Sequence, residues 1–230
     1  MATKKELVTI KPIELAKVTL HIVGDTPLIM HAWSVKAKQM MLDAQTGKAK
    51  GKAKPKKRPV EDFIDSMYWM SGKPEITDEM SDEDCEQAYN DAISAGAKFC
   101  FPVTAFKQAA ISAAYRQNWS KDKVSLRGTF FIEADSKVDS ADFGMVEIKS
   151  DIPVIREDMV RIGMGTADIR YRGQFNNWSA DLTISYNKNG QYSLENIVNM
   201  INAGGILCGV GEWRPEKDGD FGRFHVATEA

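Results

Sequence analysis

The chain has 230 residues, of which 43% are hydrophobic and 27% charged, and its formal net charge is −2. This composition is typical of a globular protein that buries a core, and it excludes collagen-like, coiled-coil and wholly disordered chains. There is no run of 18 apolar residues and no apolar segment behind the basic N-terminus, so we expect neither a membrane span nor a secretory signal. Cys85, Cys100 and Cys208 are spaced too widely for a disulfide framework or a zinc knuckle, which favours a reducing compartment.

Two oppositely charged segments lie behind the small net charge. Residues 36–58 contain eight Lys and one Arg against one Asp, a net charge of +8. Residues 61–91 contain eleven acidic residues against one Lys, a net charge of −10. The distribution of charge therefore says more about binding partners than the whole-chain isoelectric point does.

The first half of the chain contains strand, helix and loop signals in turn. Alternating β-branched residues predict a strand over 18–23, followed by a Gly-Asp-Thr-Pro turn. Ser34 is the expected N-cap of a short helix that ends at Ala44. Residues 46–59 contain no apolar side chain larger than Ala, so we expect a flexible basic loop there. The remaining expected elements are a helix over 60–70, an exposed acidic helix or loop over 77–95, a buried strand over 98–102 and a helix over 104–116.

The second half adds three strands and one helix. The expected strands are 126–134, 178–186 and 222–228, with shorter extended pieces at 146–148 and 152–155, and Ser193 caps the helix 193–202. The main elements then follow the order β-α-β-β-α-β. The sequence therefore predicts an α+β fold with a ferredoxin-like, RRM-like core forming a single domain over 1–230. Two long insertions interrupt it, at 24–98 and, as a thumb-like insertion, at 135–177.

Two basic stretches have a composition that suits nucleic-acid binding. Lysines on a flexible segment neutralise phosphates and release counterions, which gives salt-sensitive affinity without sequence preference, but a solvated loop explains them equally well. The second stretch, 156–178, interleaves arginines with aromatic residues, and such arginines fork onto phosphates while the rings stack on bases. The structural alternative pairs these arginines with Glu157, Asp158 and Asp168 and buries the rings. We favour that alternative for Trp178 and the binding function for Arg170, Tyr171 and Arg172.

Residues 204–224 contain six glycines, which indicates backbone with positive φ or a close approach by a ligand. The spacing is not that of a dinucleotide-binding loop. One interpretation is a tight loop before the last strand with Trp213 packed in the core. In the other, Trp213 joins neighbouring cations in a surface for phosphates and bases.

The candidate nucleic-acid-binding residues are cationic or aromatic side chains from these three stretches. They are Lys36, Lys38, Lys48, Lys50, Lys52, Lys54, Lys56, Lys57, Arg58, Arg156, Arg161, Arg170, Tyr171, Arg172, Arg214, Lys217 and Arg223. Catalysis has little support, because His21 (expected in the core), His31 and His225 stand outside any catalytic or metal-binding motif. We therefore expect no enzyme activity, no cofactor and no metal.

Four motifs resemble a family of proteins from tailed phages and prophages. They are TPLIMH at 26–31, REDMVR at 156–161, GEWRP at 211–215 and FGRF at 221–224. This family has no established activity, so the resemblance implies only a location, the cytoplasm of a bacterial host cell.

The order of elements is also similar to that of the RAMP superfamily, the RRM-like backbone subunits of CRISPR effector complexes. In that superfamily a thumb is inserted between the second and third strands, and a glycine-rich loop precedes the last strand. Residues 135–177 would be the thumb and 204–222 the loop. Those subunits coat single-stranded RNA as helical filaments.

The function that the sequence favours is sequence-independent binding of single-stranded DNA or RNA, with the protein assembling along the strand as a homo-oligomer or filament. It leaves DNA and RNA as open alternatives. The other function class is a protein-interaction or regulatory module, such as an assembly factor or an inhibitor of a host nucleic-acid enzyme, in which the acidic and basic segments of neighbouring molecules pair.

Overall fold

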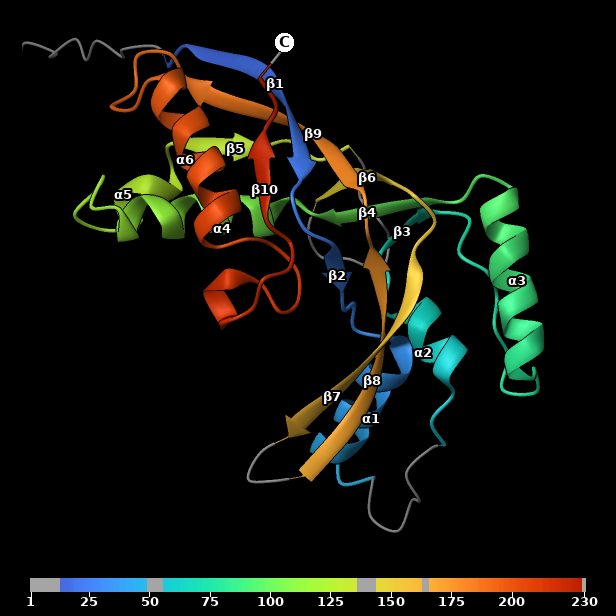
Figure 1. Cartoon of the computed structure of the whole chain (residues 1–230). Helices are drawn as coiled ribbons and strands as arrows, with labels where there is room; N and C mark the ends of the chain where they lie inside the picture. Colours follow the sequence, from blue (N-terminus) through green and yellow to red (C-terminus); the bar gives the residue numbers. More distant parts are fainter. Residues whose placement is uncertain (1–12, 49–55, 136–143, 163–165, 229–230) are drawn as a thin grey trace, which may run out of the picture.

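The computed structural model describes residues 13–48, 56–135, 144–162 and 166–228. Within these ranges, seven strands form the main sheet (Figure 1), in the order β10-β1-β9-β6-β4-β3, with β5 also paired to β9. The strands are β1 (Leu15–Gly24), β3 (Trp69–Ser71), β4 (Lys98–Pro102), β5 (Phe130–Ile132), β6 (Met145–Ser150), β9 (Trp178–Asn187) and β10 (Phe224–Val226).

The predicted α+β core is confirmed by the strand pairing. Strands β1 and β5 are both antiparallel to β9, which lies between them, and helix α4 (Val103–Arg116) is on the connection from β1 to β5. Strands β9 and β10 are both antiparallel to β1, and helix α6 (Leu194–Leu207) connects them. Each half is thus a split β-α-β unit, and together they form the ferredoxin-like arrangement.

Helices α4 and α6 pack against each other and cover one face of this sheet (Figure 1). The strands alternate accordingly: in β9, Trp178, Ala180, Leu182 and Ile184 are buried, whereas the residues between them are partly exposed. Trp178 is therefore in the core, as expected. Helix α6 begins with the predicted N-cap, where the Ser193 hydroxyl accepts a hydrogen bond from the backbone of Asn196 in a capping box.

The opposite face of the sheet is open and carries polar pairs. The expectation that His21 is a core residue is wrong, because its ring lies on this face, 2.7 Å from Asp181. Lys149 contacts the same carboxylate at 2.7 Å, and Thr19 bonds to Thr183 at 3.1 Å. Strand alternation places these residues opposite the buried side chains of β9.

Within the described ranges, the insertions supply β3 and β6 to the main sheet, and their other elements are a second, smaller sheet and three helices. Strand β2 (Leu28–Met30) pairs with β8 (Thr166–Phe175), which pairs with β7 (Val154–Ile162) as an antiparallel hairpin. The chain passes from β8 into β9 within two residues, so the hairpin projects from the main sheet (Figure 1). Helix α1 (Val35–Gln45) and helix α2 (Pro59–Asp65) lie near the hairpin, and α3 (Asp82–Ser94), the acidic helix, packs against α2, with Tyr89 against Phe63.

Among the expected elements whose bounds differ from the structure, two show a clear physical reason. The helix expected over 60–70 ends at Asp65, because the following residues form β3 along β4, where Tyr68 O accepts a hydrogen bond from Cys100 N at 2.9 Å. The strand expected over 126–134 begins only at Phe130, because α5 (Val124–Arg127) precedes it; the Asp122 carboxylate accepts a bond from Ser125 N at 2.7 Å and fixes that turn.

The structure also bears on membrane-spanning helices and on disulfides. No helix within the described ranges combines the length and the apolarity needed to cross a membrane. Cys85, Cys100 and Cys208 are each buried and unpaired.

The close approach of α4 and α6 depends on Gly204. A Cβ at this position would lie 2.7 Å from the backbone nitrogen of Ala110, so Gly204→Ala should push the helices apart and lower the free energy of unfolding by about 1–3 kcal/mol. Urea denaturation measures this. Gly128→Ala is the control, since a Cβ there meets nothing within 4 Å in the described chain. Equal stability of both variants would contradict the prediction.

Candidate nucleic-acid interface

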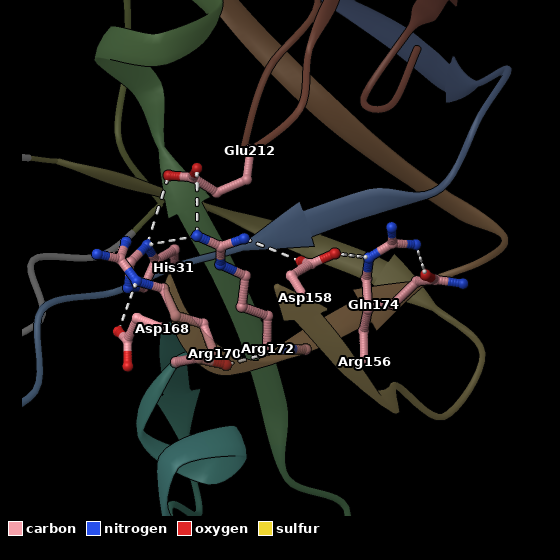
Figure 2. Close-up of polar contacts among 10 residues, drawn as sticks. His31, Arg156, Asp158, Asp168, Arg170, Arg172, Gln174 and Glu212 are labelled. Atoms are coloured by element: carbon pink, nitrogen blue, oxygen red, sulfur yellow. Dashed lines mark hydrogen bonds and ion pairs between the residues drawn. The ribbon is translucent and has the colours of Figure 1, made fainter. Parts of the chain in front are cut away.

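A buried arginine joins the two strands of the hairpin. Arg172 of β8 is 2% exposed and its guanidinium donates a hydrogen bond to Asp158 of β7 at 2.9 Å (Figure 2). Asp158 itself is 6% exposed and also accepts a bond from Arg156 at 2.8 Å. Removing these charges from water is costly, so the pair is stable only because each partner neutralises the other.

Residues from outside the hairpin complete this cluster. Glu212 lies 3.6 Å from Arg172 and 3.5 Å from the ring of His31 (Figure 2). The hydrogen bond from His31 lowers the pKa of Glu212; burial acts in the opposite direction, and the charge of Arg172 lowers the pKa further. Glu212 thus connects the loop before β10 to the hairpin and to the segment after β2 by ionic contacts.

The glycine-rich stretch allows the loop before β10 to pack against β2. Gly204 and Gly205 belong to α6, and the loop starts after Cys208 and includes a 3-10 turn, η1 (Pro215–Lys217). Gly211 has a φ of +80°, and the following N–H, of Glu212, donates to Ile29 O at 3.0 Å. The glycines therefore bring the loop against β2 of the same chain, whereas the sequence alone left open whether a ligand approaches there.

Several predicted binding residues are held in internal contacts instead. Arg172 is too buried to contact a nucleic acid, and Arg156 donates to Gln174 at 2.9 Å and lies over the ring of Phe221 at 4.5 Å. Arg58 bonds to Glu61 at 2.7 Å and to Met80 O at 2.6 Å, so it holds the segment before α3. For Arg156 and Arg172 the contacts agree with the structural alternative, because Asp158 pairs with both.

The loop residues follow the same pattern. Arg214 bonds to Gly211 O at 3.0 Å and pairs with Glu216 at 3.3 Å, and Arg223 lies 3.8 Å from Asp220. The interpretation of Trp213 as a core residue is wrong: the side chain is 39% exposed and its φ is +53°. The turn that forms η1 directs the ring outward.

Five of the predicted residues line a cleft of about 670 Å³ between α1, the segment before α2, and β8. Its cationic lining residues are Lys36, Lys56, Lys57 and Arg170, and its aromatic ones are Trp33 and Tyr171. Three chain segments far apart in the sequence thus contribute cations and rings to one concave surface. Trp33, which the sequence analysis overlooked, is 59% exposed.

Acidic residues position the cations of the cleft. Lys57 lies 3.2 Å from Asp168 and donates to Ile169 O at 2.7 Å, and Arg170 lies 3.6 Å from the same carboxylate. Burial raises the pKa of Asp168, but the hydrogen bond and the charge of Lys57 outweigh it and leave that pKa low. Burial raises the pKa of Asp62, which also lines the cleft.

Other predicted cations lie outside the cleft. Lys38, Lys48, Arg161 and Lys217 are exposed. Lys50, Lys52 and Lys54 lie outside the described residues, as does half of the expected basic loop, 49–55. Across the described part of the chain, no three His, Cys, Asp or Glu side chains are grouped so that they could hold a metal ion.

No family model and no curated protein matches this chain. Among solved structures it is similar to Cmr6 from Pyrococcus furiosus, with 12% sequence identity and a TM-score of 0.35 over 94% of this chain and 100% of that one. The assignment of the core as ferredoxin-like rests on the strand pairing. The resemblance to the phage family has no support from these comparisons.

The buried pair should make the hairpin sensitive to single charge removal. Asp158→Ala leaves Arg172 buried without its main partner and should lower the free energy of unfolding by about 3–5 kcal/mol, whereas removing both charges together, in Asp158→Leu with Arg172→Met, should recover much of the loss. Urea denaturation provides the measurement. Lys17→Ala, which removes an exposed ion pair with Glu133, is the control and should cost less than about 1 kcal/mol. A loss in Asp158→Ala no larger than in the control would refute the role of the pair.

The lowered pKa of Glu212 predicts a pH-dependent contribution to stability. The charged form is favoured in the folded state, so wild type should exceed Glu212→Gln in stability above the ordinary glutamate pKa of about 4.3. The difference should shrink as the pH falls through the lower pKa of the folded state. Thermal unfolding of both proteins across this range tests the prediction, and a difference that stays constant with pH would argue against it.

Proposed function

We propose that this protein binds single-stranded nucleic acid without sequence preference, and that the strand lies in the cleft between α1 and β8. The observation that carries the proposal is the convergence of Lys36, Lys56, Lys57 and Arg170 with Trp33 and Tyr171 on one concave surface. Cations attract the phosphates, and exposed rings offer stacking platforms to any base, so this combination favours affinity without readout of sequence.

The open face of the main sheet suits this role less well. RRM-type binding places aromatic rings on the sheet surface, where they stack on bases. Here the central strands β1 and β9 present paired polar side chains on that face, among them His21 with Asp181 and Thr19 with Thr183. The proposal therefore places the strand at the hairpin, away from the sheet.

The acidic residues of the cleft limit how much each cation contributes. Asp168 already neutralises part of the charge of Lys57 and Arg170, and a phosphate has to compete with it. Lys56, together with the exposed Lys38 and Lys48 nearby in sequence, supplies additional charge. The lysines at 50, 52 and 54 belong to the same tract and extend the proposed binding segment.

Two sets of variants separate phosphate attraction from stacking. Lys56→Ala with Lys57→Ala should weaken binding to all sequences alike and reduce the dependence of affinity on salt, because fewer counterions are released. Trp33→Ala should cost about 1–3 kcal/mol of binding free energy with little change in the salt dependence. Fluorescence anisotropy with single-stranded DNA and RNA at two salt concentrations measures both, and also shows which polymer is preferred.

Matched controls lie on other surfaces. Trp119→Ala replaces an exposed tryptophan near the ends of α4 and α6, and Lys121→Ala with Lys188→Ala removes two exposed lysines outside the cleft. These variants should bind as wild type does. No binding of wild type to either polymer at low salt would refute the proposed function, and equal losses in cleft and control variants would refute the assignment to the cleft.

Assembly along the strand is the finer part of the proposal. A protein that coats the strand should bind with a stoichiometry that rises in proportion to strand length. Such a protein would suit replication or recombination in a phage, or the coating of RNA. Sedimentation of complexes with strands of increasing length measures the stoichiometry.

Helix α1 favours the second function class, a protein-interaction or regulatory module. None of its residues is buried, and it exposes Val35, Met40, Met41 and Leu42. In that case the protein should purify without nucleic acid, with the absorbance ratio of protein alone, and Met41→Lys should abolish binding to the partner without affecting stability. An assembly factor or an inhibitor of a nucleic-acid enzyme would have this behaviour.

A further inference from the structure

Strand β7 has an unpaired outer edge. It is the terminal strand of the three-stranded sheet, and in the part of the chain that the structure describes no other strand pairs with it. The strand is nine residues long, so it presents a row of backbone donors and acceptors. Such an edge is a template for a further strand.

One face of the hairpin beside this edge is exposed and largely apolar. Alternation places Arg156 and Asp158 on the face toward the glycine-rich loop, and the residues between them on the other. On that other face Met159 is 77% exposed, directly across from Ile169 at 43%, and Ile155 is 47% exposed. Glu157 and Arg161, also exposed, flank Met159 on the same face.

This face is self-complementary in charge. When two copies of a strand pair antiparallel about a twofold axis, the residues equally far from the central residue lie opposite each other and on the same face. With Met159 at the centre, Glu157 of each copy faces Arg161 of the other, so two opposite-charge pairs flank a contact between the methionines. A centre at Glu157 or Asp158 would instead place two like carboxylates opposite each other.

We propose that a second copy of this chain binds at this edge, forming a closed dimer through β7 with Met159 on the twofold axis. The pairing joins two three-stranded sheets into a continuous six-stranded one, satisfies the edge hydrogen bonds and brings the two Met159 side chains into lateral contact. The charges at 157 and 161 select this register. In other registers each of these residues faces an apolar residue or a residue of the same charge. The inference does not depend on nucleic-acid binding.

Charge reversal gives the first test. Wild type should sediment as a species of twice the chain mass of 25.6 kDa. Glu157→Arg or Arg161→Glu alone places like charges opposite each other twice and should give monomers, whereas the two changes together restore opposite charges and should restore the dimer. Lys188→Glu, a reversal elsewhere on the surface, should leave the dimer intact. Circular dichroism and thermal unfolding verify that each variant is folded.

Oxidative cross-linking gives the second test, and it reports the register. Met159→Cys places the two thiols opposite each other at the axis, close enough for a disulfide, and should give a covalent dimer on mild oxidation. The native cysteines are buried and give no background. Ile155→Cys, away from the axis, is the matched control and should not cross-link.

Three outcomes would overturn the proposal: a monomeric wild type without cross-linking of Met159→Cys, a dimer that survives both single reversals, or failure of the double reversal to restore it. An assembly that grows without limit would also overturn it, because a twofold pairing is closed. A monomeric protein that still binds nucleic acid in the anisotropy assay would refute the dimer alone. A dimer that binds no nucleic acid would refute the proposed function alone.

Discussion

The placement of the β7–β8 hairpin depends on the buried ion pair between Arg172 and Asp158. Both side chains are almost fully removed from water, at 2% and 6% exposure, and a buried charge is tolerated only with its partner in good geometry. Glu212 adds a second carboxylate from the loop before β10. A hairpin that slipped or rotated would leave these charges unpaired, so the cluster fixes one arrangement of hairpin, loop and core. Its contribution is to specificity of the fold more than to net stability.

That arrangement also forms the cleft. Arg170 and Asp168 lie on the same strand as Arg172, on the same face by alternation, and Asp168 holds Lys57 from the segment before α2. The ion pairs that orient the hairpin thus lie next to those that hold Lys57 and Arg170 at the cleft. A ferredoxin-like core hosts many functions, so the residues of this surface indicate the function and the fold does not.

Two of the places where the molecule exposes apolar side chains are α1 and the outer face of the hairpin. They differ in physical character. Helix α1 exposes methionines beside lysines and is preceded by the exposed ring of Trp33, which suits a flexible polyanion as well as a protein. The hairpin presents a backbone edge with charges in a self-complementary order, which suits a second copy. The net charge of the chain hides both, because the acidic segment 61–91 offsets the basic segment 36–58.

Local pattern in the sequence determined the elements whose signals are local. Alternation specified β1 and β9, helical periodicity specified α4, and serine caps specified the starts of α1 and α6; their order then gave the α+β core. The sequence also identified the interleaved arginines, but not their roles, because pairing of Arg172 with Asp158 or of Lys57 with Asp168 depends on strand register and on segments over 100 residues apart. The sequence pattern predicted a helix from 60 to 70, but the helix ends at Asp65, since pairing with β4 overrides helical propensity there. Only the tertiary structure decided which cations are buried, which reach solvent, and that Trp213 points outward, because burial is set by packing between elements and not by neighbours along the chain.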